Sequence, residues 1–423
     1  MNKRFVTLML VMLCALWVGG AIQGQGSADY SIYYLLDIDG ISQLVRADLT
    51  GAQISISSVE QGSVVAYDAS DSVAFVTRSL DGQLTLHLST LDGSQTLEVL
   101  SPATQVYDVR LTPDAVYVNA KGADELPVMF GYDRSLNLIM TRPVALRDAV
   151  QTISPSGEWA LAYHSSGQFG VYALPSTARA EFPMIPNGFT AMAWSPTVDQ
   201  FQLIGANTDG TQPFIYLIDL DLNTTRQFSL PTIPANSIVQ AKWSDHGRYI
   251  VYSTSATSDR LLITDVTTGI QTELAEPGFI LAPLTWSADD EWLLYIAQIG
   301  GASSDLFAFN PLTGERRSIR IPGAQIASAV WSPDAGILAA TTIGLNNTIT
   351  IYTAVAPAFD LWIPIFTTDD GRFAQAFVYW AGTSLLFEHD SSLLLATAPT
   401  QQLTRISPTL YPIVLNSIFV STQ

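Results

Sequence analysis

A short pattern that returns every 41 to 49 residues constrains this chain more than any other sequence feature. Each copy is a run rich in β-branched and aromatic residues, followed by a turn of the Ser-Pro-Asp-Gly type or a relative of it. The copies are anchored at Tyr67, Leu111, Ile153, Trp194, Trp243, Trp286, Trp331 and Trp380. A mean spacing of about 45 residues is typical of repeats that each form one four-stranded sheet, or blade, of a β-propeller.

The segment from residue 237 to 280 shows how one repeat divides into strands. A first strand ends at Trp243, and Ser244-Asp245-His246-Gly247 turns the chain. Three more strands are predicted over Tyr249–Thr254, Arg260–Asp265 and Gln271–Leu274, because β-branched and aromatic runs alternate there with turn residues. No amphipathic helix is expected after the N-terminal leader.

The two chain ends predict how the ring closes. Ile32–Asp37, Gln43–Asp48 and Gln53–Ser57 supply three strand-like runs without a first strand, and Tyr411–Thr422 is strand-like too. We therefore predict an all-β fold: a single β-propeller of eight or nine four-stranded blades, closed by N- and C-terminal strands that share one blade. The count stays open, because propellers typically have four to eight blades.

The five tryptophans that end first strands are predicted to pack between neighbouring blades. A blade cannot bury both of its faces alone, so large flat side chains at equivalent positions fill the space between blades. The turns that follow them need no ligand to explain their composition, because Pro, Asp and Gly each favour tight turns.

Composition limits the classes of ligand. Asp and Glu number 38 against 19 Lys and Arg, which gives a formal charge of −19. Nucleic-acid binding draws on clustered basic residues, so we expect no nucleic-acid partner and favour a neutral or cationic ligand. Only 13% of residues are charged and 48% are hydrophobic, which predicts a large core with the charges confined to turns and rims.

Residues 1–26 are predicted to be a secretory signal peptide, cleaved near residues 21–26, and residues 27–423 to be the propeller domain. Lys3 and Arg4 begin the leader, and an apolar run from Phe5 to Val18 and small residues follow. An uncleaved anchor is the alternative, because the apolar stretch can extend through Ala21. The protein is expected in the periplasm, the cell envelope or the medium, with no membrane span in the mature chain. Cys14, the single cysteine, lies in the leader, so no disulfide is expected.

The box Trp331-Ser332-Pro333-Asp334, and the pairing of Trp243 with Asp265-Val266-Thr267-Thr268-Gly269, resemble the repeat of TolB-type periplasmic propellers. The same repeat is similar to the propeller portion of dipeptidyl peptidase IV-like proteins. The resemblance implies architecture, since propellers of this kind serve as binding modules, peptidase-gating domains and sugar enzymes. The chain leaves no room for TolB's separate N-terminal α/β domain, so a peptidoglycan-associated lipoprotein is not expected as its partner. It also lacks the Gly-x-Ser-x-Gly motif of the peptidases.

The histidines and one run of oxygen ligands are the candidate metal ligands of the sequence. His87, His164, His246 and His389 fall in separate repeats without metal-binding spacing, although blades can converge on the channel. Asp219-Leu220-Asp221-Leu222-Asn223 places three oxygen ligands close together, but Thr224 and Leu230 break the calcium-loop pattern, so a hairpin is favoured.

Two further sets of polar residues have both a structural and a functional interpretation. Phe387-Glu388-His389-Asp390 is predicted to be a solvated turn between the second and third strands of the last blade. The carboxylates of Asp114, Asp289, Asp290 and Asp334 are predicted to be structural because they lie in turns, while glycoside hydrolysis would need two of them to meet across the channel.

We predict a secreted or periplasmic, non-catalytic scaffold that binds a protein, peptide or glycan at a face or in the central funnel. It is expected to be a monomer, with no catalytic, cofactor-binding or metal-binding residue assigned and no cofactor. The alternative is an extracytoplasmic enzyme with its site in the channel, either a glycan hydrolase or lyase or a metal-dependent hydrolase. Paired carboxylates beside an aromatic platform would favour the enzyme.

Overall fold

The computed structural model describes residues 30–422 with gaps. The gaps are residues 144–151, 164–168, 175–188, 207–212, 221–223, 230–237, 255–259, 276–278, 281–284, 300–302, 322–323, 345–347, 357, 360, 370–377, 390–391, 398–401 and 408–418. The predicted signal peptide, residues 1–26, therefore lies outside the described residues.

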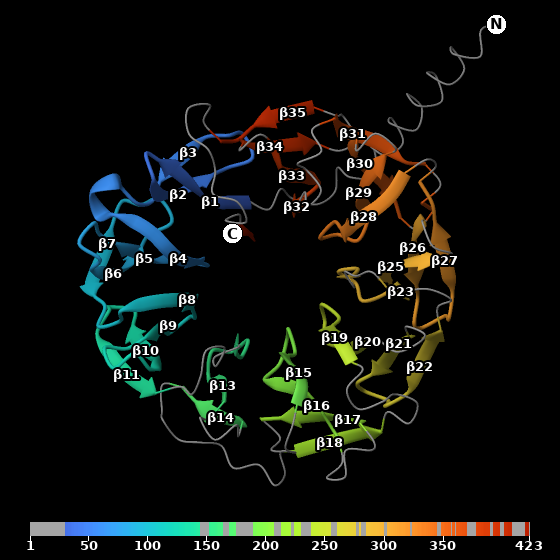
Figure 1. Cartoon of the computed structure of the whole chain (residues 1–423), viewed down its shortest axis with the longest axis horizontal. Coiled ribbons are helices and arrows are strands. Elements are labelled where there is room, and N and C mark those ends of the chain that lie inside the picture. Colours follow the sequence, from blue (N-terminus) through green and yellow to red (C-terminus); the bar gives the residue numbers. More distant parts are fainter. Residues whose placement is uncertain are drawn as a thin grey trace, which may run out of the picture.

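The described residues form nine antiparallel sheets, which Figure 1 shows arranged in a ring. We number them blades 1 to 9 in chain order. Blade 1 contains β1 (Tyr30–Ile38), β2 (Ile41–Ala47), β3 (Gln53–Ser55) and β36 (Phe419–Thr422). Blade 2 contains β4 (Ser63–Ala69), β5 (Val73–Arg78), β6 (Leu84–Ser89) and β7 (Thr96–Leu100). A short 3-10 helix, Val59–Gln61, leads from blade 1 to blade 2. Blade 3 contains β8 (Gln105–Leu111), β9 (Ala115–Lys121), β10 (Pro127–Asp133) and β11 (Leu138–Pro143).

Blades 5 and 6 follow the same four-stranded plan, and blade 4 has three strands among the described residues. Blade 4 contains β12 (Thr152–Ile153), β13 (Trp159–Tyr163) and β14 (Phe169–Ala173). Blade 5 contains β15 (Phe189–Trp194), β16 (Gln200–Ala206), β17 (Pro213–Asp219) and β18 (Thr224–Ser229). Blade 6 contains β19 (Ile238–Trp243), β20 (Tyr249–Thr254), β21 (Arg260–Asp265) and β22 (Gln271–Ala275). The strands of blade 6 match the sequence-based prediction to within one residue wherever it gave bounds.

Blades 7 to 9 complete the ring. Blade 7 contains β23 (Phe279–Ile280), β24 (Thr285–Trp286), β25 (Leu293–Ile299), β26 (Ser303–Phe309) and β27 (Arg316–Ile319). Blade 8 contains β28 (Ala324–Trp331), β29 (Ile337–Gly344), β30 (Ile349–Val355) and β31 (Ile363–Thr368). Blade 9 contains β32 (Val378–Ala381), β33 (Ser384–His389), β34 (Ser392–Thr397) and β35 (Gln402–Arg405).

The chain ends meet in blade 1, as the sequence predicts. β36 pairs antiparallel with β1, and Ile32 lies opposite Val420. Apolar side chains of blade 1, among them Ile32 and Tyr34, pack with Leu386 and Ile406 of blade 9. The first and last blades are thereby joined. Among the described residues, nine sheets favour nine of the predicted eight or nine blades.

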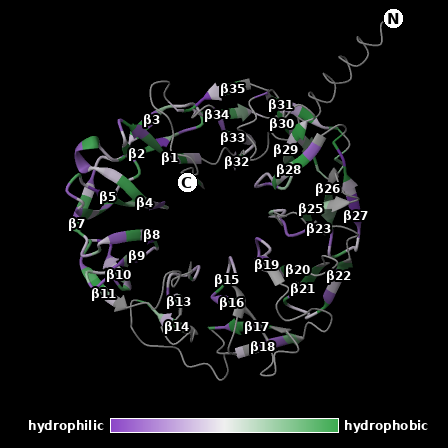
Figure 2. Cartoon of the chain, in the orientation of Figure 1, coloured by the Kyte–Doolittle hydropathy of each residue, from purple (hydrophilic) through white to green (hydrophobic). Residues whose placement is uncertain are grey.

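Apolar contacts between neighbouring blades form the core. Separate clusters join blades 1 and 2, 2 and 3, 3 and 4, 5 and 6, 6 and 7, 7 and 8, and 8 and 9. Figure 2 shows hydrophobic residues along the strands of these sheets. Burial of apolar area at each interface stabilises the ring, because no single blade covers its own two faces.

The recurring tryptophans of blades 6 to 9 pack between blades, which confirms the predicted role of these four. Trp194 of blade 5 is buried and packs edge-on against Phe201 of its own blade. Trp243 of blade 6 lies in the cluster that contains Ile215 and Leu217 of blade 5. Trp286 of blade 7 stacks on Tyr249 of blade 6, with ring centroids 5.5 Å apart. Trp331 and Trp380 are buried in the same way in the clusters between blades 7 and 8 and between blades 8 and 9.

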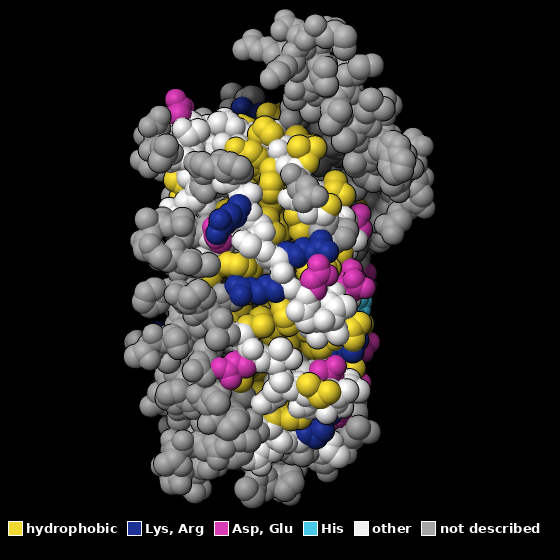
Figure 3. Space-filling view, turned by 90° about the vertical axis from the view of Figure 1, so that its right-hand side faces the viewer, with side chains coloured by type: hydrophobic (Ala, Val, Ile, Leu, Met, Phe, Trp, Pro, Cys, Tyr) yellow, Lys and Arg dark blue, Asp and Glu magenta, His cyan; other side chains and the backbone are white. Residues whose placement is uncertain are grey.

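Charged side chains occur on the outer side of the ring and on its inner strands, where Asp68 lies in β4 and Asp108 in β8. Figure 3 shows the side of the ring at the right of Figure 1, where basic and acidic side chains lie close together among apolar ones. In blade 7, an ion pair joins Arg317 Nε to Glu315 Oε1 at 2.7 Å. Among the described residues, the buried carboxylates are those of Asp199, Asp290 and Asp305.

Candidate functional site

The turns between first and second strands interlock along one rim of the ring. Asp290 in blade 7 is only 6% exposed, and its Oδ2 accepts a hydrogen bond from Ser244 Oγ of blade 6 at 2.6 Å. Its Oδ1 accepts another from the His246 backbone N–H at 2.9 Å. In the same manner, Asp199 of blade 5 accepts hydrogen bonds from Ser156 of blade 4. The backbone N–H and the hydroxyl of Ser156 are the donors. Both oxygens of each carboxylate accept hydrogen bonds from the neighbouring blade, so these side chains join the blades.

The four carboxylates singled out from the sequence do not meet at one site. Asp114 lies in blade 3, Asp289 and Asp290 in blade 7, and Asp334 in blade 8. Asp289 and Asp334 accept hydrogen bonds from Ser287 and Ser332 of their own turns, both at 2.5 Å. The prediction that turn geometry explains these residues is confirmed for the three in blades 7 and 8.

The described histidines lie apart as well. His87 is buried on β6, where its Nε2 lies 2.8 Å from Thr77 Oγ1 and its ring stacks on Phe75. His246 is in an exposed turn of blade 6, and His389 at the end of β33 packs its ring against Phe366. His164 lies outside the described residues. Within the described part of the chain, no three His, Cys, Asp or Glu residues form a group suited to a metal ion.

Two predicted turns have different outcomes. Asp219 lies opposite Thr224 at the end of the β17–β18 pair, as the predicted hairpin requires, while residues 221–223 lie outside the described residues. Phe387–His389 belong to strand β33 and not to a turn, so that prediction is wrong. The strand continues because Phe387 is fully buried at the interface with blade 8. Asp390 is outside the described residues.

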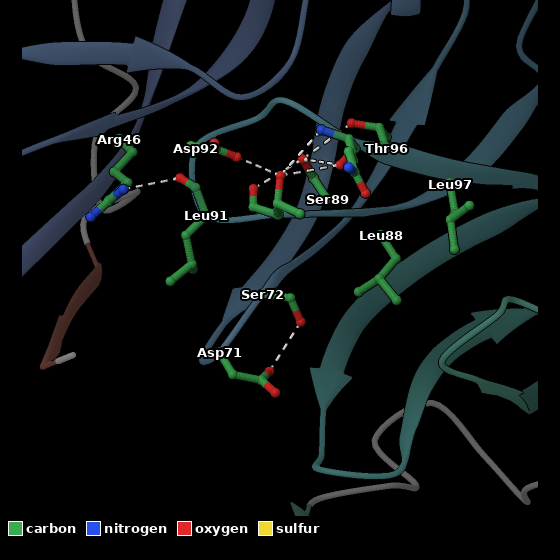
Figure 4. A pocket seen from close by; sticks show the side chains of 11 residues that line it. Arg46, Asp71, Ser72, Leu88, Ser89, Leu91, Asp92, Thr96 and Leu97 are labelled. Atoms are coloured by element: carbon green, nitrogen blue, oxygen red, sulfur yellow. Dashed lines mark hydrogen bonds between the residues drawn. The ribbon is translucent and has the colours of Figure 1, made fainter.

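A pocket of about 580 Å³ opens beside the turns of blade 2 (Figure 4). It is lined by Arg46, Asp71, Ser72, Leu88, Ser89, Thr90, Leu91, Asp92, Gln95, Thr96 and Leu97. Arg46 comes from β2 of blade 1, and the others from the β4–β5 turn and the β6–β7 hairpin. Its volume is in the range of small-ligand sites, which run from about 300 to 1,000 Å³.

Asp92 is the best-oriented anion of this pocket. Its Oδ1 accepts hydrogen bonds from Thr90 Oγ1 at 2.6 Å, from Ser94 Oγ at 2.7 Å and from the Ser94 backbone N–H at 3.0 Å. The hydroxyls of Thr90 and Ser94 and the Ser94 N–H lower the pKa of Asp92 to about 2. The carboxylate is therefore ionised at any physiological pH.

Asp71 lies across the pocket and is held by blade 3. Arg134 Nη2 donates to its Oδ1 at 2.8 Å, and Arg134 Nη1 donates to Ser72 Oγ at 2.6 Å. Burial alone would raise the pKa of Asp71, but the hydrogen bonds from Arg134 and Ser72 outweigh it, and the pKa lies below its usual value.

Arg46 and three leucines complete the lining. Arg46 Nε donates to Ser31 Oγ at 2.9 Å and its Nη1 donates to the Leu91 carbonyl at 3.1 Å, which fixes the guanidinium between blades 1 and 2. Leu88 is buried, Leu91 is half-buried, and Leu97 is 51% exposed. The pocket thus combines two carboxylates, a guanidinium and an aliphatic wall.

A second pocket of about 420 Å³ lies between blades 3 and 4. Its lining includes Asp114, Glu158, Tyr117 and Trp159. Burial raises the pKa of Tyr117 to about 12, and the Asp114 carboxylate adds to that rise. The lining thus brings two carboxylates and two aromatic residues to one pocket, with Tyr117 itself buried.

The inner strands β4 and β8 bring two more carboxylates near each other. Asp68 Oδ2 accepts a hydrogen bond from the Leu111 backbone N–H at 2.8 Å and lies 4.0 Å from Arg110 Nε. Desolvation on burial raises the pKa of Asp108, and electrostatic repulsion from the Asp68 carboxylate adds to that rise. Asp68 links blades 2 and 3, so its contacts are those of a structural residue.

Sequence reasoning did not find the blade 2 pocket. The lining residues are spread over two turns of blade 2, and Arg46 lies in a different blade from the rest of the lining. The motif Thr90-Leu91-Asp92-Gly93-Ser94 does signal a tight turn with a capping carboxylate, but nothing in it shows that a cavity adjoins the turn.

Comparison with known proteins supports the fold. No protein-family model and no curated protein sequence matches the chain. Among solved structures, one described as the eukaryotic initiation factor is similar with a TM-score of 0.66 and 14% identity, over 93% of this chain and 98% of that one. Dipeptidyl peptidase 4 of Porphyromonas gingivalis is similar with a TM-score of 0.55 and 10% identity, over 92% of this chain and 60% of that one. TolB from Acinetobacter baumannii matches at a TM-score of 0.32 and 12% identity, over 72% of this chain and 80% of that one.

The chain is an all-β propeller protein. Its predicted resemblance to propeller repeats of the dipeptidyl peptidase IV type is confirmed at the level of the fold by the similarity to dipeptidyl peptidase 4. Identities below 25% carry the fold and not the function. In the described part of the chain, no helix has the length and hydropathy needed to cross a membrane.

Proposed function

We propose that the chain works outside the cytoplasm as a non-catalytic scaffold that binds a protein, peptide or glycan at the turn-bearing rim of its ring. The pocket beside blade 2 carries this proposal, because its polar side chains are held in place by protein donors and acceptors. Preorganised polar groups next to an apolar wall are typical of binding sites. The leader-like residues 1–26 support an extracytoplasmic location, and the low basic content argues against nucleic acid.

The carboxylates of the rim favour binding over catalysis. Asp199 and Asp290 hold neighbouring turns together, and Asp289 and Asp334 cap their own turns. A general acid or base needs a carboxyl group that is open to a substrate. These four side chains already serve the fold.

The test is a pull-down of the mature chain from envelope or culture-medium extract, with retained molecules identified by mass spectrometry. We expect the tagged chain to retain a ligand specifically. Excess untagged protein should compete for that ligand and reduce its retention. The scaffold proposal fails if nothing is retained while the protein turns over a panel of glycan substrates.

A second candidate function is action on a glycan at the pocket between blades 3 and 4. Asp114 and Glu158 with the rings of Tyr117 and Trp159 favour it. Glycan turnover that is lost in both Asp114→Asn and Glu158→Gln, with unfolding midpoints unchanged, would establish this function. Turnover that persists in both variants would exclude this pocket as the site.

A further inference from the structure

We propose that the pocket beside blade 2 binds a lysine or arginine side chain presented by a peptide segment of an extracytoplasmic protein. This inference rests on the proposed scaffold function and names the chemistry of its ligand. The pocket supplies a carboxylate for the cationic group, a guanidinium for a backbone carbonyl and leucines for the aliphatic stem.

Asp92 provides the partner for the cation. Its Oδ1 is taken by Thr90 and Ser94, which orient the group, while its Oδ2 accepts no hydrogen bond from the residues that the structure describes. No Lys or Arg of the described residues forms an ion pair with Asp92, whereas Asp71 is paired with Arg134. The one unpaired negative charge of the pocket is thus Asp92, within the described part of the chain.

Arg46 provides the partner for the peptide backbone. Its Nε and Nη1 are tied to Ser31 and to the Leu91 carbonyl, and its Nη2 donates to none of the described residues. A ligand that carried only a positive charge would leave this donor unused and would be repelled by it. A peptide meets both needs, because its carbonyl oxygen accepts from the guanidinium while its side chain reaches the carboxylate.

The apolar part of the lining fits the stem of a long cationic side chain. Leu88, Leu91 and Leu97 lie on the pocket wall, and Figure 4 shows Leu88 and Leu97 on the side away from Arg46. Lys and Arg place their methylene groups against apolar surface while the charged end stays with polar groups. None of the lining residues is aromatic, so the stacking platform expected for a glycan is missing from this pocket.

The experiment measures binding of short synthetic peptides to the full chain by isothermal titration calorimetry. The peptides are N-acetylated and C-amidated Gly-Leu-X-Leu-Gly, with lysine, arginine, norleucine or glutamate at X, and chitotetraose serves as the glycan probe. We expect the lysine and arginine peptides to bind at least about tenfold more tightly than the norleucine peptide, because the charge-assisted hydrogen bond is lost there.

Asp92→Asn and Asp81→Asn form a matched pair of variants. Both remove one negative charge from an exposed turn of blade 2. Each aspartate accepts a hydrogen bond from a nearby hydroxyl, Asp92 from Thr90 and Asp81 from Ser79. Asp81 lies in the β5–β6 turn and does not line the pocket. Asn keeps the Oδ1 acceptor, so the fold is retained, which the unfolding midpoint checks. Asp92→Asn should weaken the lysine peptide about tenfold, and Asp81→Asn less than twofold.

Several outcomes would overturn the inference. Equal binding of norleucine and lysine peptides, equal effects of the two variants, or binding of chitotetraose alone at this pocket would each do so. Failure of the inference is separable from failure of the scaffold function. If wild type and Asp92→Asn retain the same ligand from extract, the chain is a binding scaffold whose ligand does not use this pocket.

Discussion

The carboxylate of Asp290 belongs to blade 7 but completes the turn of blade 6, because its Oδ2 accepts a hydrogen bond from Ser244 Oγ at 2.6 Å. Asp290 also has a φ of 60°, a conformation that Asn and Asp tolerate better than other non-glycine residues. Asp290→Ala should therefore lower the free energy of unfolding by about 2 to 4 kcal/mol, since it leaves buried donors unpaired and strains the backbone. Urea unfolding of the variant measures the loss.

Asp289→Ala is the control for that change. Asp289 is exposed and bonds only within its own turn, so its loss should cost less than about 1 kcal/mol. Similar losses in the two variants would mean that the contact between blades adds nothing to stability.

Gly157 tests how closely neighbouring blades approach. Its φ is +79°, and an added Cβ would lie 2.8 Å from Thr112 Cβ of blade 3. Gly314 has a nearly identical φ of +74° with nothing within 4 Å of the added atom. We expect Gly314→Ala to cost about 1 kcal/mol from backbone strain alone, and Gly157→Ala at least about 1 kcal/mol more. Thermal unfolding of both variants measures the two losses of stability. A smaller loss for Gly157→Ala than for Gly314→Ala would contradict the close approach of the blades.

His87 should make stability depend on pH. Burial lowers its pKa from 6.5 to about 4, although the nearby Glu98 opposes that shift. Between these values the unfolded chain binds more protons than the folded chain, so stability is fully present above pH 6.5 and falls as the pH drops towards 4. The His87 contribution at pH 5 should be lower than at pH 7 by about 2 kcal/mol. Urea unfolding of wild type and His87→Gln at both pH values isolates the contribution of His87 to the free energy of unfolding. An identical pH dependence in the two proteins would refute this contribution.

β36 should carry part of the stability of the closed ring. It pairs with Tyr30–Tyr33 of β1, and Val420 packs against the cluster that joins blades 1 and 9. A chain that ends at residue 418 should lose several degrees of Tm, because an inner strand and its hydrogen bonds are removed. A chain that lacks only Gln423 is the control. An unchanged Tm on the longer deletion would show that closure does not depend on β36.

The predicted leader has a direct test. Protein recovered from the periplasm or medium should begin between Ile22 and Ser27, as cleavage near residues 21–26 requires. Intact-mass measurement gives the first residue. A mature protein that retains Met1 and stays with the membrane fraction would favour the uncleaved anchor.

The sequence by itself determined the repeat, the strands and the role of the recurring tryptophans. These are local and periodic properties: β-branched runs form strands, Pro and Gly end them, and one aromatic position per repeat meets the next blade. The ends of the chain also predicted the shared blade, because three strands without a first strand need a fourth. The number of blades was left at eight or nine, since a count near the upper limit of known propellers depends on how the last strand pairs.

Only the tertiary structure decided which polar residues meet. Asp290 and Ser244 are 46 residues apart in the chain, and Arg46 and Leu91 are 45 apart, yet each pair forms a hydrogen bond because successive blades pack side by side. Both turns contain an aspartate beside Ser or Thr, yet Asp290 makes a structural contact between blades and Asp92 lines a pocket. Nothing local distinguishes them, because the difference lies in what the neighbouring blade places opposite the carboxylate.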